Sequence, residues 1–331
     1  MERLAPLLTV ARNAARRASA VCLAVLDRAP GRPDAMAKGG REPVTIADYA
    51  SQAVILEAVS GAFPGHRVVA EEGAEHFRAS AGAGADGLIV GLVADAIGRP
   101  TDLEEVLGWI DHAGGHDEPV WAIDPIDGTK GFLRGEQFAV AIGLIHEGAA
   151  VAGVLGCPHL PLDPDEPESG RGVLFWGGPG IGAFAEPLGG GTPQAIAVSE
   201  VADPAAVRVL GSVEPAHGDP ALVRAVIGEA GFGGGVVRID SQAKYGAVSA
   251  GRAEVYLRPR NRPDYRERVW DHAAGAAIVA GAGGRVTDLD GRALDFSCGR
   301  RLEDNRGVVA SNRVVHEQVL AALRTVEATG I

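Results

Sequence analysis

The sequence predicts an α/β protein built from layers of strands and helices. Its second half alternates the two: VRVLGS, DPALVRAVIGEAG, VVRID, SQAKYGAVSAG and AEVYLR follow one another. Such alternation favours a layered α/β architecture. Three apolar segments before them, EPVWAID, EQFAVAIGLIHEG and AAVAGVLGCP, are typical of strands. With 331 residues, 46% of them hydrophobic, the chain can bury a large core as one fold or two lobes.

The first element expected is an amphipathic helix that ends near residue 28. Apolar side chains recur at helical spacing, at Leu4, Leu7, Leu8, Ala11, Ala14, Ala18 and Val21. The same stretch carries Arg12, Arg16 and Arg17 with almost no acid, so an organellar transit peptide is the alternative interpretation.

A second helix is expected over residues 49–63, followed by a strand at residues 66–73. Asp48 of VTIAD precedes the helix, and its structural interpretation is a helix N-cap, a common use of aspartate. The strand HRVVAEEG ends in two glutamates, Glu71 and Glu72. Residues 74–118 are less regular: ASAGAGADG predicts a loop, and TDLEEVLGWI predicts a helix capped by Thr101 or Asp102.

The polar segment PLDPDEPESGRG predicts a linker and a boundary between two lobes, residues 1–165 and 166–331. After it, VLFWGGPGIGAFAE predicts a hairpin. Its Gly178-x-Gly180-x-Gly182 resembles a nucleotide loop only superficially, because no helix follows. Near the end, WDHAAGAAIVAGAG predicts a helix, GRVTDLDG and RGVVAS predict strands, and a last helix is expected through about Val326.

Composition limits the partners. A net charge of −12 argues against general binding to nucleic acid or to anionic membranes. Cys22, Cys157 and Cys298 are scattered singly, so neither a zinc site nor a disulfide framework is predicted, and a cytoplasmic setting fits. His112 and His116 would pair on a metal only in a helix, and the glycines between them favour a loop. We find no apolar run long enough for a membrane span.

The stretch WAIDPIDGTKGF, residues 121–132, carries the clearest chemistry. Asp124 ends an apolar strand, a proline is expected to stop the strand ladder, and Asp127 then turns toward the same side. Mg²⁺ favours carboxylates combined with phosphate oxygens and water. Gly128 and Thr129 would open the next segment with free N–H groups suited to a phosphate. A structural turn with aspartate caps is the alternative for an isolated D-x-x-D.

Other segments favour the metal interpretation. Glu71 and Glu72 end a different strand, and Asp271 opens a helix, which are the places where ligands gather in α/β folds. RPRNRPDYRERVW places several arginines just before Asp271, either as a solvated face or as an anion site. Acidic metal ligands beside basic phosphate ligands predict phosphoester chemistry.

These motifs resemble a known family. DPIDGT and WDHAAG are similar to the two signatures of the lithium-sensitive, magnesium-dependent phosphomonoesterases of the inositol monophosphatase superfamily. DPIDGTKGFLRGEQFAVAIGLI, DSQAKYGAVSAGRAEVYLRP and YRERVWDHAAG resemble its 3′(2′),5′-bisphosphate nucleotidase branch. The likeness covers essentially the whole chain. It implies the α/β (α+β) sugar-phosphatase fold, a layered α-β-α-β-α sandwich of two lobes.

The resemblance also implies roles for residues. Two or three Mg²⁺ ions would be held by Glu71, Asp124, Asp127, Asp271 and the carbonyl of Ile126. Asp48 and Thr129 would orient and deprotonate the attacking water. The substrate contacts implied are Gly128, Thr129, His217, Ser241, Lys244 and Arg258. One departure is Ala70, where the family usually has glycine before the glutamate pair.

The implied reaction removes the 3′-phosphate of adenosine 3′,5′-bisphosphate and gives AMP and phosphate. The 2′,5′ isomer and 3′-phosphoadenylyl sulfate stay open as substrates, and an inositol phosphate or fructose 1,6-bisphosphate is the alternative within the same chemistry. An aspartyl-phosphate phosphatase would need D-x-D spacing, whereas this chain has D-x-x-D. A binding protein that lost turnover would lack Asp48 or Thr129, and both are present. The sequence leaves the oligomeric state open.

Overall fold

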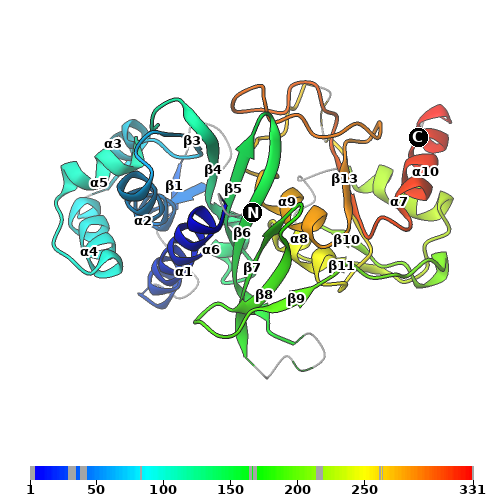
Figure 1. The fold of residues 1–331 in the computed structure, drawn as a ribbon, viewed down its shortest axis with the longest axis horizontal. Coiled ribbons are helices and arrows are strands. Elements are labelled where there is room, and N and C mark those ends of the chain that lie inside the picture. The colour runs from blue at the N-terminus through cyan, green and yellow to red at the C-terminus, as the bar shows by residue number, and fades with distance from the viewer. Residues whose placement is uncertain are drawn as a thin grey trace.

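The computed structural model describes residues 4–28, 35–37, 43–82, 84–163, 166, 170–213, 219–260, 262 and 264–329. Its elements stack in five layers, helices alternating with two sheets (Figure 1). Helices α1 (Ala5–Arg28) and α2 (Ile46–Ala62) cover the outer face of the larger sheet, and α8 (Ala243–Ser249) and α9 (Ala273–Gly281) lie between the sheets (Figure 1). The fifth layer is α7 (Pro220–Glu229) with α10 (His316–Ala328). The predicted α-β-α-β-α sandwich is confirmed.

Among the described residues, the larger sheet has seven strands in the order β3-β4-β5-β6-β7-β8-β9. β3 pairs parallel with β4, and every later neighbour is antiparallel. The strands are β3 (His66–Ala70), β4 (Asp117–Asp127), β5 (Ala139–His146), β6 (Ala149–Pro161), β7 (Arg171–Gly178), β8 (Gly182–Pro187) and β9 (Gln194–Ile196). The predicted hairpin is confirmed as β7–β8, so its glycines form a turn.

The smaller sheet has five strands in the described chain, in the order β11-β10-β12-β14-β13. β10 pairs parallel with β11 and β12, and β14 pairs antiparallel with β12 and β13. The strands are β10 (Val209–Gly211), β11 (Val236–Arg238), β12 (Val255–Arg258), β13 (Arg285–Thr287) and β14 (Val308–Ser311). A short 3-10 helix, η2 (Pro204–Ala206), precedes β10, and β1 (Ala35–Ala37) pairs separately with β2 (Pro43–Thr45).

Three apolar cores lie between the layers. The first core lies between α1, α2 and the larger sheet, and Tyr49 and Trp121 are fully buried in it. The second lies between the two sheets around Phe175 and Tyr245. The third joins the smaller sheet to α7 and α10. The apolar face predicted for the first helix is buried in the first core, apart from the half-buried Leu4.

The chain between β3 and β4 is more helical than the sequence suggests. Beside α5 (Leu103–Ile110), whose N-cap is Asp102 as predicted, it forms α3 (Ala74–Ser80) and α4 (Ala85–Ile97). The loop expected over ASAGAGADG is therefore wrong at both ends. Glycine and alanine weaken the local helix signal, but α4 packs against α1, α2 and α5, and that packing outweighs propensity. His112 and His116 follow α5 outside any helix, as expected.

The larger sheet continues past the predicted lobe boundary. β7, β8 and β9 lie after residue 165 and still belong to it, and the chain enters the smaller sheet only at β10. The division of the chain into two lobes stays a prediction. No helix in the described part of the chain is both long and apolar enough to cross a membrane.

Candidate active site

The acidic side chains gather where β3 and β4 end. These strands run parallel, so their carboxyl ends meet at one edge of the sheet. The N–H of Glu71 donates to the carbonyl of Ile123 at 3.2 Å, which places this glutamate beside the residue that precedes Asp124. Ala70 ends β3 in regular pairing with Ile123, so its methyl group leaves the strand undisturbed.

Pro125 does not end β4, contrary to the sequence expectation. The strand continues to Asp127 through a register shift, with Asp124 opposite Ala141 and Asp127 opposite Ala139. This irregularity accommodates the missing proline donor, because a bulge leaves one residue unpaired. The Pro125 carbonyl accepts a hydrogen bond from the hydroxyl of Ser51 at 2.9 Å. The bulge thereby brings both aspartates to the end of the strand.

A one-turn helix, α6 (Thr129–Leu133), begins two residues after Asp127. Gly128 precedes it with φ of +87°, a left-handed conformation that favours glycine. A Cβ atom at this position would lie 3.1 Å from Cβ of Ser241, so the first signature and the DSQAKY segment are in close contact. The Thr129 hydroxyl donates to the Ile126 carbonyl at 3.2 Å.

Asp48 lies in α2 at the third helical position rather than at the N-cap, which is Thr45. Its Oδ2 accepts from the Thr45 N–H at 2.8 Å and from the Thr45 hydroxyl at 2.7 Å, completing a capping box. Burial, together with Glu72 and Glu71, raises the pKa of Asp48 well above its usual range. Asp48 thus has a raised proton affinity beside the acidic cluster.

The carboxylates lie close enough to repel one another. Burial and the charges of Glu71, Asp127 and Asp271 raise the pKa of Asp124 well above its usual range. Burial, Asp127 and Glu71 also raise the pKa of Asp271, against the opposing effect of Arg258. Buried carboxylates in such numbers are stabilised by cations. An oxygen-donor set of this kind suits hard divalent ions such as Mg²⁺, so these residues fit the metal that the sequence implies.

The substrate contacts predicted in DSQAKY lie next to this cluster. The N–H of Gln242 donates to Oδ2 of Asp127 at 2.5 Å. Ser241 precedes it with φ of +69°, a strained conformation for a non-glycine residue that is characteristic of functional sites. The Lys244 ammonium donates to the Ile239 carbonyl at 3.0 Å. Burial lowers the pKa of Lys244 to about 8, although Asp127 opposes the shift.

Arg258 ends β12 and pairs with two carboxylates. Its Nη2 lies 3.0 Å from Glu267 and 3.2 Å from Asp271. The charges of Glu267 and Asp271 raise the pKa of Arg258 further above its usual range, against the effect of burial. Of the other arginines in this loop, Arg268 lies over the Trp270 ring with its guanidinium carbon 5.6 Å from the centroid. The loop is therefore partly tied to the site rather than only a solvated face.

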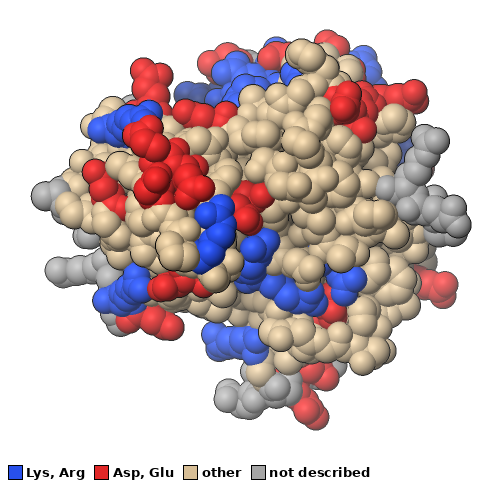
Figure 2. Space-filling model, turned by 60° about the vertical axis from the view of Figure 1, so that its left-hand side comes forward, with Lys and Arg blue, Asp and Glu red and all other residues tan. Residues whose placement is uncertain are grey.

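Basic side chains also form a band across one face of the molecule, next to acidic side chains (Figure 2). The net charge of −12 is thus unevenly distributed.

Several residues at the site carried no signal in the sequence. Arg300 lies in no motif, yet its Nη2 donates to the Ala70 carbonyl at 2.9 Å. Its guanidinium carbon also lies over the Trp270 ring, 4.4 Å from the ring centroid. Gln242 and Glu267 stand inside recognised segments, but their types alone indicate no function. Predicted His217 lies outside the described residues.

A cavity of about 480 Å³ adjoins the DSQAKY segment. Its walls are mostly apolar and include Leu160, Leu210 and Val237, and Arg238 and Asp240 add charge. Asp240 is held by Arg134, whose Nη2 lies 2.7 Å away. Mostly apolar walls with a few polar groups are typical of sites for small organic ligands.

Solved structures show the same fold class. Over 99% of both chains, this protein superposes on an IMPase of Thermotoga maritima with a TM-score of 0.66 at 21% identity. The extragenic suppressor protein SuhB of Bartonella henselae gives 0.68 at 22% identity, covering 99% of this chain and 100% of that one. These identities establish the fold alone.

Sequence comparison gives the family. The model of the inositol monophosphatase family matches residues 3–328, and the chain belongs to this family. A relative from Emericella nidulans named 3′(2′),5′-bisphosphate nucleotidase is 39% identical over 88% of this chain and 90% of its own. A relative of the same name from Oryza sativa is 38% identical over 96% and 93%.

Proposed function

We propose that the protein is a Mg²⁺-dependent phosphomonoesterase that removes the 3′-phosphate of adenosine 3′,5′-bisphosphate to give AMP and phosphate. The observation that carries the chemistry is the gathering of acidic side chains around Asp124, where the parallel strands β3 and β4 end. The choice of substrate rests on the relatives named 3′(2′),5′-bisphosphate nucleotidase and on the cavity lined in part by Asp240, whose mostly apolar walls suit a nucleobase. The 2′,5′ isomer and 3′-phosphoadenylyl sulfate are further candidate substrates.

Glu71, Asp124, Asp127, Asp271 and the carbonyl of Ile126 would hold two or three Mg²⁺ ions. Bound there, Mg²⁺ would polarise the phosphate and favour the ionisation of water. The Ile126 carbonyl already accepts the Thr129 hydroxyl, and a carbonyl oxygen has a second lone pair for a cation.

Residues of the protein would then accept the proton of the attacking water and bind the anionic nucleotide. The attacking water gives its proton to Asp48 by way of the Thr129 hydroxyl, which would turn from the Ile126 carbonyl toward Asp48 to pass the proton on. The phosphorus–oxygen bond to the ribose breaks, the 3′-oxygen leaves and takes up a proton from solvent as a hydroxyl group, and Asp48 returns its proton to solvent. The N–H groups after Gly128 face the phosphate, while Ser241, Lys244 and Arg258 bind the rest of the nucleotide, together with His217. A cytoplasmic location and inhibition by lithium are parts of the same proposal.

The test is phosphate release by the purified protein with and without Mg²⁺. Adenosine 3′,5′-bisphosphate, inositol 1-phosphate and fructose 1,6-bisphosphate are compared at equal concentration. We expect Mg²⁺-dependent release with strong preference for the nucleotide. Preference for inositol 1-phosphate would be consistent with the proposed metal ligands but would contradict the roles of Ser241, Lys244 and Arg258. No release from any of the three would refute phosphomonoesterase activity.

A further inference from the structure

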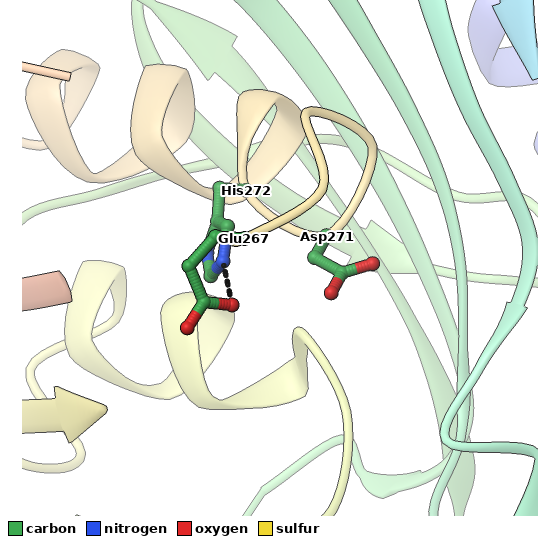
Figure 3. A group of neighbouring side chains, drawn as sticks. All are labelled: Glu267, Asp271 and His272. Carbon is green, nitrogen blue, oxygen red and sulfur yellow. Dashed lines mark hydrogen bonds and ion pairs between the residues drawn. The ribbon is translucent and has the colours of Figure 1, made fainter. Parts of the chain in front are cut away.

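A buried chain of hydrogen bonds lies behind Asp271 and ends at two groups of the candidate site. Glu267, Asp271 and His272 lie on the segment that leads into α9, with Glu267 and His272 directed toward each other (Figure 3). Glu267 and His272 have side chains that are 1% and 0% exposed. Within this series of hydrogen-bonded side chains, only Arg258 and Asp271 reach the surface, and their side chains are 18% and 15% exposed.

The contacts define the direction of each bond. Oε2 of Glu267 lies 3.0 Å from Nε2 of His272 and 3.0 Å from Nη2 of Arg258. A carboxylate can only accept here, so Nε2 of His272 carries the hydrogen and Nδ1 is the acceptor. The Tyr245 hydroxyl donates to this Nδ1 at 2.7 Å. Nη2 of Arg258 also donates to Oδ2 of Asp271 at 3.2 Å, which completes the chain.

Glu267, Asp271 and His272 could be taken for a metal site of their own, because one ligand atom from each lies within 4.8 Å of the others. The bonds argue otherwise. Both ring nitrogens of His272 are engaged, and Oε2 of Glu267 already accepts two donors. The arrangement holds side chains in place.

Charge explains why a second carboxylate is needed. Without Glu267, the Arg258 guanidinium would face Asp271 alone and neutralise it. With Glu267 present, one cation is shared by two carboxylates, and the three groups together keep a net negative charge that favours a divalent ion. The buried bonds also fix Arg258 in one orientation, which lowers the entropy lost when it binds an anion.

We propose that Glu267 is a positioning residue: it holds the Arg258 guanidinium beside Asp271, in the place from which Arg258 contacts a phosphate of the substrate. This inference rests on the proposed function, because it takes Asp271 as a metal ligand and Arg258 as a substrate contact.

The test compares Glu267→Gln with a matched control, Glu254→Gln. Glu254 is also a buried carboxylate, at 0% exposure, and it pairs with Arg208 at 2.7 Å. Its other side-chain partner is Ser199, and neither partner belongs to the candidate site. Steady-state kinetics are measured with adenosine 3′,5′-bisphosphate while Mg²⁺ is varied, and thermal unfolding is followed for every variant.

We expect Glu267→Gln to raise both KM and the half-saturating Mg²⁺ concentration about tenfold, with a smaller change in kcat. Glu254→Gln should lower the melting temperature and leave KM and the Mg²⁺ requirement unchanged. In the background of Arg258→Lys, Glu267→Gln should change KM less than about twofold, because residues that act through each other are not additive.

Three results would overturn the inference: KM and Mg²⁺ requirement unchanged in Glu267→Gln, equal changes in Glu254→Gln, or an effect that adds fully to that of Arg258→Lys. If Glu267→Gln does not fold, Tyr245→Phe tests the same series of hydrogen bonds at its other end, where the Tyr245 hydroxyl contacts His272. We expect it to raise KM about threefold. An unchanged KM there contradicts the proposal. Wild-type protein that releases no phosphate from the nucleotide refutes the proposed function and this inference together, whereas normal wild-type turnover with unaffected variants refutes only the inference.

Discussion

The backbone N–H of Gln242 donates to Oδ2 of Asp127 at 2.5 Å, although 115 positions separate the two residues in sequence. The side chain of Gln242 continues the connection. Its Nε2 donates to the Trp270 carbonyl at 2.8 Å, and its Oε1 accepts from the Gly275 N–H at 3.2 Å. One buried residue therefore connects the segment DPIDGT at the end of β4 to the segment WDHAAG at the start of α9.

Gln242→Ala should lower the free energy of unfolding by about 2–4 kcal/mol, because a buried carbonyl and a buried N–H lose their partners. Turnover should fall as well, since Trp270 directly precedes Asp271. Chemical denaturation and phosphate release measure the two effects. Gln318→Ala is the control: this side chain donates to the Ala230 carbonyl at 2.9 Å in the outer helical layer, away from the site. Equal losses of turnover in both variants would contradict a specific role for Gln242.

Asp127→Asn should separate charge from hydrogen bonding. The amide oxygen can still accept from Gln242, but the repulsion that raises the pKa of Asp124 is reduced. Turnover should fall at least about a hundredfold, as expected when metal affinity is weakened. Thermal unfolding in a chelator should be unchanged or shifted upward, and the stabilisation produced by Mg²⁺ in the wild type should be lost. Near wild-type turnover would refute Asp127 as a metal ligand.

The sequence predicts the layers because alternating strands and helices with long apolar segments leave few other architectures. It also identifies Asp124, Asp127 and Asp271, because acids at the ends of apolar strands and at helix starts stand out locally. Gln242 and Arg300 escape such reasoning, since their roles depend on contacts between segments far apart in the chain. The bulge at Pro125 is missed for a similar reason: pairing with β5 carries the strand past a residue that locally ends strands.

The pKa of Lys244, lowered by burial to about 8 from the usual 10.5, predicts a pH dependence of binding. Below pH 8 the ammonium group is charged and attracts the nucleotide, and above it the charge is lost. KM should therefore rise with pH above about 8, and Lys244→Met should have a raised KM that varies less with pH. A wild-type KM that stays constant from pH 7 to about pH 9.5 would contradict a contact with substrate.

The same group affects stability with a defined sign. The folded-state pKa of Lys244 lies below that of the unfolded chain, so the unfolded chain binds more protons between about pH 8 and 10.5. The contribution of Lys244 to stability therefore rises with pH in that window, and replacing it with methionine removes this contribution. The free energy of unfolding of the wild type minus that of Lys244→Met should therefore be larger at pH 10 than at pH 7.

Thr45→Ala should affect stability and catalysis through a single hydroxyl. That hydroxyl accepts from the Ala47 N–H at 3.1 Å and donates to Asp48 at 2.7 Å. Loss of the helix cap should cost about 1 kcal/mol of unfolding free energy. Loss of the donor removes an interaction that holds the pKa of Asp48 down, so this pKa should rise and the acidic limb of the pH–rate profile should move to higher pH. Thr45→Ser keeps the hydroxyl and should behave as wild type. A stability loss without a shifted profile would mean that Asp48 is not the proton acceptor, because the capping box joins the two residues directly.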